Sequence, residues 1–126
     1  MRRYSKYNAK RINGYDSQKE AKRAEELKLL QKSGAIRNLK EQTAFILQPN
    51  FRDDSGKMVR AIKYVADFVY VKTCDNCLMI EDVKGWRTKD YIIKSKMLKK
   101  HIADGSIREI CNDIDFDFSK VIFFES

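Results

Sequence analysis

The sequence predicts a mixed α/β domain, with a restriction-endonuclease-like central sheet flanked by helices. Two observations predict it. Apolar runs typical of strands alternate with two helical segments, and the 126 residues, 43% of them hydrophobic, contain no repeat or linker that would divide them. One core of ordinary size fits this length. We expect residues 1–126 to form one domain, with a basic arm at 1–15 and an acidic stretch at 113–126.

Each element has a local signal. A helix is expected from Ser17 to Ser33, with Gly34 ending it. Thr88 is placed to cap a second helix over 89–102. The expected strands are 35–49, 57–72, 78–85 and 120–125, with turns at 52–56 and at the sequence CDNC. The segment 104–119 has no clear preference.

The net charge of +8 is unevenly distributed. The first 15 residues hold five cations and no acid, with tyrosines between them. The cations are Arg2, Arg3, Lys6, Lys10 and Arg11. Such an arm suits a polyanion such as nucleic acid, although a disordered, solubilising tail is the alternative. The role of the acidic stretch is left open.

The sequence has no segment that predicts a membrane or secreted location. No apolar run approaches the ~20 residues of a transmembrane helix. No apolar segment follows the charged start, as it would in a secretory signal. We therefore expect a cytoplasmic protein without a membrane partner, whose three cysteines are reduced thiols.

Three charged residues, Asp67, Asp82 and Lys84, interrupt two apolar runs. If residues 75–76 form a two-residue turn, Asp67 lies opposite Lys84 and Val69 lies opposite Asp82. Directly opposed side chains share one face of a sheet, so the three charges converge. This inference depends on the register, because a slip of one residue would separate them.

Two carboxylates and a lysine in this arrangement suit metal-assisted phosphodiester chemistry. Carboxylates hold Mg²⁺, which keeps several waters and lowers their pKa. A lysine beside such a water can orient it, help deprotonate it or stabilise developing charge. The alternative is an ion-paired hairpin with no catalytic role.

Glu20 lies at the centre of the apolar face of the first helix. Ala24 and Leu27 fall within roughly 40° of it on a helical wheel, so its carboxylate points into the fold. There it could reach a metal held on the sheet. The alternative is a capping box, in which Ser17 and Glu20 satisfy the first backbone amides of the helix.

These pieces together resemble the PD-(D/E)XK nuclease superfamily. The sequence YVADF contains Asp67, IEDVKG contains the D-x-K half-motif Asp82–Lys84, and DSQKEAKRAEEL supplies Glu20 upstream. The string KYNAK…DSQKEA…ADF…EDVKG resembles more closely a family of small phage and prophage Holliday-junction-resolvase-like endonucleases, over about residues 5–100. Ala66 stands where the motif has proline. Glu81 beside Asp82 offers a second candidate ligand, and strand parity favours Asp82.

The resemblance implies a metal-dependent DNA endonuclease. Glu20, Asp67, Asp82 and the backbone carbonyl of Val83 would bind one or two Mg²⁺ ions, with Mn²⁺ as a substitute. Lys84 would help activate the attacking water. The products would carry 5′-phosphate and 3′-hydroxyl ends. A phage or prophage origin would place the protein in the bacterial cytoplasm, and two symmetric cuts in branched DNA would require a homodimer.

Cations after the D-x-K strand are candidates for phosphate contact. They are Arg87, Lys89, Lys94 and Lys96. Trp86 could also touch the DNA backbone. The alternative is an ordinary solvated helix face.

Other metal motifs are incomplete. The CDNC spacing is typical of zinc, but a full site needs two more ligands and only His101 and Cys111 remain, so zinc is not expected. DIDFDF lacks the glycine and the twelfth-position acid of a calcium loop.

Two other functions compete with the endonuclease. One is a non-catalytic nucleic-acid-binding protein on the same fold. The other is a nuclease-like fold used for protein contacts, supported only by the acidic stretch.

Overall fold

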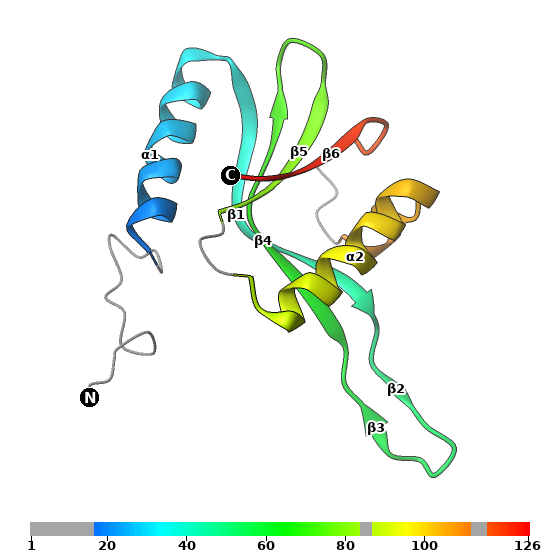
Figure 1. Ribbon diagram of the computed structural model, residues 1–126. Helices are drawn as coiled ribbons and strands as arrows, with labels where there is room; N and C mark the ends of the chain where they lie inside the picture. Colours follow the sequence, from blue (N-terminus) through cyan, green and yellow to red (C-terminus); the bar gives the residue numbers. More distant parts are fainter. Residues whose placement is uncertain (1–16, 84–86, 112–115) are drawn as a thin grey trace, which may run out of the picture.

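A computed structural model describes residues 17–83, 87–111 and 116–126. Its centre is a four-stranded sheet in the order β1-β4-β5-β6 (Figure 1). The strands are β1 (Ile36–Gln48), β4 (Ile62–Lys72), β5 (Cys77–Asp82) and β6 (Val121–Glu125). β1, β4 and β5 pair antiparallel, and β6 runs parallel to β5. The predicted class, a mixed sheet flanked by helices, is confirmed.

Both long helices begin where the sequence signals indicate, and the second ends at Asp104, two residues beyond its expected end at 102. α1 spans Gln18–Ser33, with Ser17 as N-cap and Gly34 as C-cap at φ 90. A positive φ is easily adopted by glycine, which has no Cβ. α2 spans Lys89–Asp104 and is capped by the Thr88 side chain, which accepts a hydrogen bond from the Tyr91 N–H. The short α3 (Ile107–Ile110) forms within residues 104–119, for which the sequence indicates no clear preference.

The sheet separates two apolar cores. Residues of one strand alternate between them: Val69 and Val71 pack on the side of α2, whereas Phe68 and Tyr70 pack on the side of α1. The α1 side contains Ala24, Leu27, Ile36, Phe68, Tyr70, Cys77, Met79 and Val83. The α2 side includes Phe45, Leu47, Tyr64, Ala66, Val69, Val71, Leu78, Ile80, Leu98 and Ile107.

The predicted register of β4 and β5 is wrong by two residues. Val69 pairs with Ile80, where Asp82 was expected, and Lys72 pairs with Cys77. The reason is the connection, which has four residues (73–76) instead of two, so that Cys77 pairs with Lys72 instead of with Cys74. A shift of two keeps every side chain on its face, and it places Asp67 beside Asp82 instead of beside Lys84. Lys84 itself lies outside the described residues.

The predicted strand over 57–72 is also interrupted. Met58–Val59 (β3) pairs with Phe51–Arg52 (β2) in a separate two-stranded hairpin, and β4 starts only at Ile62. Between them the Ala61 N–H turns to the Asn50 side chain, at 2.6 Å from its Oδ1. The hairpin extends away from the body of the protein (Figure 1).

None of the helices in the described part of the chain is long and apolar enough to cross a membrane.

Candidate functional site

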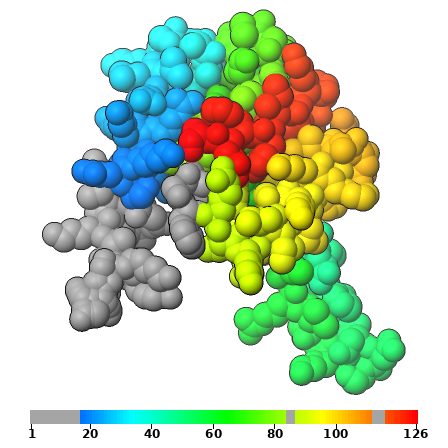
Figure 2. All heavy atoms as spheres, in the orientation of Figure 1, coloured from blue at the N-terminus to red at the C-terminus, as the bar shows by residue number. Residues whose placement is uncertain are grey.

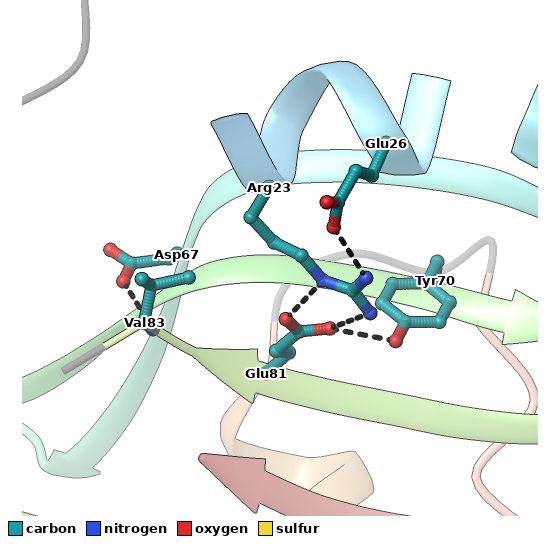
Figure 3. A network of polar contacts seen from close by, with 6 residues as sticks. All are labelled: Arg23, Glu26, Asp67, Tyr70, Glu81 and Val83. Atoms are coloured by element: carbon teal, nitrogen blue, oxygen red, sulfur yellow. Dashed lines mark hydrogen bonds and ion pairs between the residues drawn. The ribbon is translucent and has the colours of Figure 1, made fainter. Parts of the chain in front are cut away.

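Asp67 lies where β4 and β5 stop pairing. The last pair of the ladder is Phe68 with Glu81. Beyond it, the Asp67 N–H donates to Asp82 Oδ1 at 3.1 Å, and the Val83 N–H donates to Asp67 Oδ2 at 2.9 Å (Figure 3). Hydrogen bonds from backbone N–H groups to side-chain carboxylates therefore replace the backbone pairs where the ladder ends, and they hold Asp67, Asp82 and Val83 together.

Glu20 reaches this place from α1. Its backbone N–H is capped by Ser17 Oγ at 3.1 Å, so the predicted N-cap is confirmed. Glu20 as a whole is 6% exposed, and its carboxylate accepts a hydrogen bond through Oε2 from Gln42 Nε2 at 3.2 Å. The same nitrogen lies 3.4 Å from Asp67 Oδ1. The structure thus joins Glu20 and Asp67 through one amide group.

Gln42 is a site residue that the sequence did not indicate. It lies in β1 at φ 55, a left-handed conformation that is uncommon outside glycine and asparagine. The β1–β4 pairs run from Glu41–Phe68 to Thr43–Ala66 without a pair between Gln42 and Asp67. Flanked by polar neighbours, Gln42 reads in sequence as an ordinary solvent-facing strand residue. No local signal marks it.

Where the pair between Gln42 and Asp67 is missing, the alternation of β4 side chains between the two faces of the sheet also changes. Tyr64 and Ala66 share the α2-side core with Val69 and Val71, so the alternation is interrupted between Ala66 and Val69. Asp67 occupies this interruption and is 8% exposed. Non-glycine residues in left-handed conformations often occur at functional sites, where surrounding contacts offset a cost of about 1–3 kcal/mol.

Two of the three predicted acids, Glu20 and Asp67, place their oxygen atoms where they could bind a hard cation. Carboxylate oxygens of Glu20 and Asp67 converge on one position, now taken by the amide nitrogen of the exposed Gln42. Oxygen donors in such a position suit Mg²⁺. Asp82 Oδ1 is turned to the Asp67 backbone. Within residues 17–83, 87–111 and 116–126, no three or more His, Cys, Asp or Glu side chains form a group arranged to hold a metal ion.

Glu81 has a different task from Asp82. It is fully buried on the α1 side and forms a two-pronged ion pair with Arg23, at 2.6 Å (Nε–Oε2) and 3.1 Å (Nη2–Oε1) (Figure 3). The Tyr70 hydroxyl donates to Oε1 at 2.8 Å. Burial, together with this hydrogen bond to Glu81, raises the pKa of Tyr70. With its carboxylate bound in this way, Glu81 is a structural anchor between α1 and the sheet.

With this geometry in place, the comparisons with known proteins identify a family. Residues 4–117 match the family described as "Protein of unknown function (DUF1064)". The chain belongs to the DUF1064 family. No curated protein and no solved structure matches it.

A second polar group of this DUF1064 chain joins α2 to the edge strand β6. Arg87 donates to Glu125 from Nε at 3.2 Å and from Nη2 at 3.0 Å, and the Tyr91 hydroxyl donates to the same carboxylate. The Arg87 and Tyr91 hydrogen bonds lower the pKa of Glu125. Arg87, expected at the DNA, is therefore used in an ion pair on the α2 side of the sheet.

The remaining predicted DNA contacts fall into two groups. Lys89 and Lys96 are exposed on α2, and Lys94, half-buried, lines a groove against β4. Arg2, Arg3, Lys6, Lys10, Arg11, Lys84 and Trp86 lie outside the described residues. The cysteines of CDNC separate: Cys74 is exposed in the loop, whereas Cys77 is buried in the α1-side core.

Proposed function

We propose that this protein is a metal-dependent DNA endonuclease that hydrolyses phosphodiester bonds, selective for branched DNA in the manner of a Holliday-junction resolvase. The observation that carries the proposal is the shared amide of Gln42, which joins a buried carboxylate from α1 to one from β4 beside Asp82 of β5. Burying charged groups is costly unless they are paired or serve a site. Asp82 stands two residues before Lys84, in the D-x-K half-motif.

In this proposal Glu20, Asp67 and Asp82 hold Mg²⁺, or Mn²⁺ in its place, with the Val83 carbonyl as a further ligand. When bound, the metal would lower the pKa of a water and neutralise charge on a phosphate oxygen. Lys84 helps to orient or deprotonate the attacking water. The water oxygen bonds to phosphorus, the bond from phosphorus to O3′ breaks, and O3′ takes up a proton, leaving 5′-phosphate and 3′-hydroxyl ends.

The same proposal includes the setting. Cutting a four-way junction symmetrically needs two sites related by a two-fold axis, and therefore a homodimer. Cys74, Cys77 and Cys111 are thiols, which agrees with a reducing bacterial cytoplasm, where a phage or prophage protein would act.

One observation favours a second function, that of a non-catalytic nucleic-acid-binding protein. As the side chains lie, protein groups donate to Asp67 and to Asp82 Oδ1, and the described residues contain no ready three-acid metal group. In that case the acids would be structural.

The deciding experiment is cleavage of a labelled four-way junction and a matched linear duplex in Mg²⁺, Mn²⁺ or EDTA. We expect paired cuts in the junction that EDTA abolishes. Asp67→Asn, Asp82→Asn and Lys84→Ala should lose turnover yet bind DNA as tightly as the wild type. Binding without cleavage under every metal would overturn the nuclease and leave the binding protein.

Glu81→Gln is the matched control for Asp82→Asn, since it removes a neighbouring carboxylate whose partners are Arg23 and Tyr70. Assayed below its unfolding temperature, this variant should still cut. Loss of cleavage in Glu81→Gln with retention in Asp82→Asn would exchange the roles of the two acids.

A further inference from the structure

The β2–β3 hairpin is well built but contributes nothing to either core. Asp53 Oδ1 closes its turn by accepting from the N–H groups of Ser55 and Lys57, at 2.9 and 3.0 Å, and Gly56 takes φ 84. Yet no residue from 49 to 61 is buried. The hairpin extends from the body as an arm of its own (Figure 2). An ordered arm without a packing role indicates a contact made outside the chain.

The side chains of this arm have the chemistry of a DNA contact. Three exposed cations, Arg52, Lys57 and Arg60, lie along it, and a fourth, Lys63, is exposed at the start of β4 directly after it. In the described part of the chain, no carboxylate forms an ion pair with Lys57, Arg60 or Lys63. The two acids of the arm are Asp53, which is used in the turn, and Asp54.

Apolar side chains accompany these cations. Phe51 is 47% exposed and Met58 is 46% exposed. Met58 pairs with Arg52 and Phe51 pairs with Val59, so each face of the hairpin presents one of them. Two-stranded ribbons of this kind fit a DNA groove, where cations contact phosphates and apolar side chains contact bases or sugars.

A groove of about 250 Å³ lies between the start of β4, which follows the hairpin, and the start of α2. β4 lines it with Lys63, Tyr64 and Val65, and the N-cap and N-terminal part of α2 line it with Thr88, Asp90, Tyr91 and Lys94. The two lysines thus come from different elements. Tyr91 links the groove to the site, because its hydroxyl donates to Glu125, and Glu125 of β6 pairs with Asp82 of β5.

We propose that the β2–β3 hairpin and the groove at its base bind one duplex arm of the DNA, by contacts to the phosphates, and lead it to Asp67 and Asp82. The destination of the duplex rests on the proposed function, whereas the binding itself needs neither metal nor cleavage. The local charge decides for DNA over a second copy of this hairpin, since Lys57, Arg60 and Lys63 would there face the same cations, whereas DNA offers phosphates.

The test is the salt dependence of DNA binding in EDTA, with Lys57→Gln, Arg60→Gln and Lys63→Gln combined. Each lost phosphate contact lowers the slope of log K against log salt by about 0.9. We expect the slope to be shallower by roughly 2 to 3 and the affinity to fall about tenfold or more at low salt. Since none of the three side chains is buried, the melting temperature should not change.

The matched control removes the same charge elsewhere, with Lys28→Gln, Lys32→Gln and Lys120→Gln combined. Its slope should stay close to that of the wild type. Equal slopes in the hairpin variant and the wild type would overturn the proposal. So would a wild-type dimer that the hairpin variant turns into a monomer without changing the slope, because a second copy would then be the occupant.

The outcomes also separate this proposal from the nuclease. If the wild type binds DNA through the hairpin but never cuts it, the proposed DNA contact of the hairpin is supported and the proposed nuclease activity is overturned. If the hairpin variant binds and cuts the junction as the wild type does, the proposed nuclease activity is supported and the proposed DNA contact of the hairpin is overturned.

Discussion

Glu20 and Asp67 accept hydrogen bonds from the same nitrogen atom, Nε2 of Gln42. The two acids come from α1 and β4, and the amide comes from a left-handed position in β1. One side chain therefore joins three elements at the end of the paired part of the sheet.

Gln42→Asn should remove the hydrogen bonds from Gln42 to the two acids while it keeps the backbone conformation at position 42. Asparagine tolerates the positive φ at position 42, but it is one methylene shorter and does not reach both acids. We expect the free energy of unfolding in EDTA to fall by about 1 kcal/mol, measured by urea denaturation. Glu41→Ala, at the exposed neighbouring position, should cost less. A Gln42→Asn variant with the same free energy of unfolding as the wild type would show that these hydrogen bonds contribute nothing to stability.

Mg²⁺ should stabilise the folded protein if the acids hold it. A ligand that binds only the native state at about 100 times its Kd adds about 2.7 kcal/mol. We expect a rise in melting temperature with Mg²⁺ that EDTA reverses and that Glu20→Gln and Asp67→Asn reduce. Glu25→Gln, on an exposed face of the same helix, should keep the full rise. A wild type without any rise would contradict metal binding.

Arg23→Met should be among the most destabilising changes on α1. It leaves the fully buried Glu81 carboxylate without its ion-pair partner, which typically costs about 3–5 kcal/mol. Lys22→Met, at an exposed neighbour, is the control. Adding Glu81→Met to Arg23→Met should restore part of the loss, because replacing both partners removes the uncompensated charge. If the double variant is no more stable than the single one, the pair is not the cause.

Stability should decrease in acid partly through Glu125. Its folded-state pKa lies below its usual value because of Arg87 and Tyr91. Its contribution is therefore complete above the usual glutamate pKa and disappears as the pH falls through the lowered folded-state value. We expect Glu125→Gln to be less stable than the wild type at pH 7 and to approach it as the pH falls below the usual glutamate pKa. A constant difference at all pH values would exclude this origin.

Thiol labelling tests the corrected loop. Cys74 is exposed, whereas Cys77 and Cys111 are buried. A thiol reagent should modify Cys74 quickly in the native protein, and all three cysteines only after unfolding. Mass spectrometry of the peptides identifies the labelled residue. Equal labelling of Cys74 and Cys77 in the native state would favour the two-residue turn, in which the two cysteines lie opposite each other.

Local signals in the sequence determined the helices and most strands. Ser17, Gly34 and Thr88 each act on backbone groups within a few residues, so the bounds of α1 and the start of α2 follow without knowledge of the rest of the fold. The apolar runs likewise determined β1, β4, β5 and β6. Parity along a strand also placed Glu81 and Asp82 on opposite faces.

Only the tertiary structure decided the register, the partner of Glu81 and the part played by Gln42. The loop at 73–76 closes with four residues because Cys77 is buried against α1, which the CDNC sequence does not show. Arg23 reaches Glu81, and Gln42 reaches Glu20 and Asp67, across long separations in the chain. Such contacts depend on how α1 packs on the sheet, and local preferences of the backbone do not specify that packing.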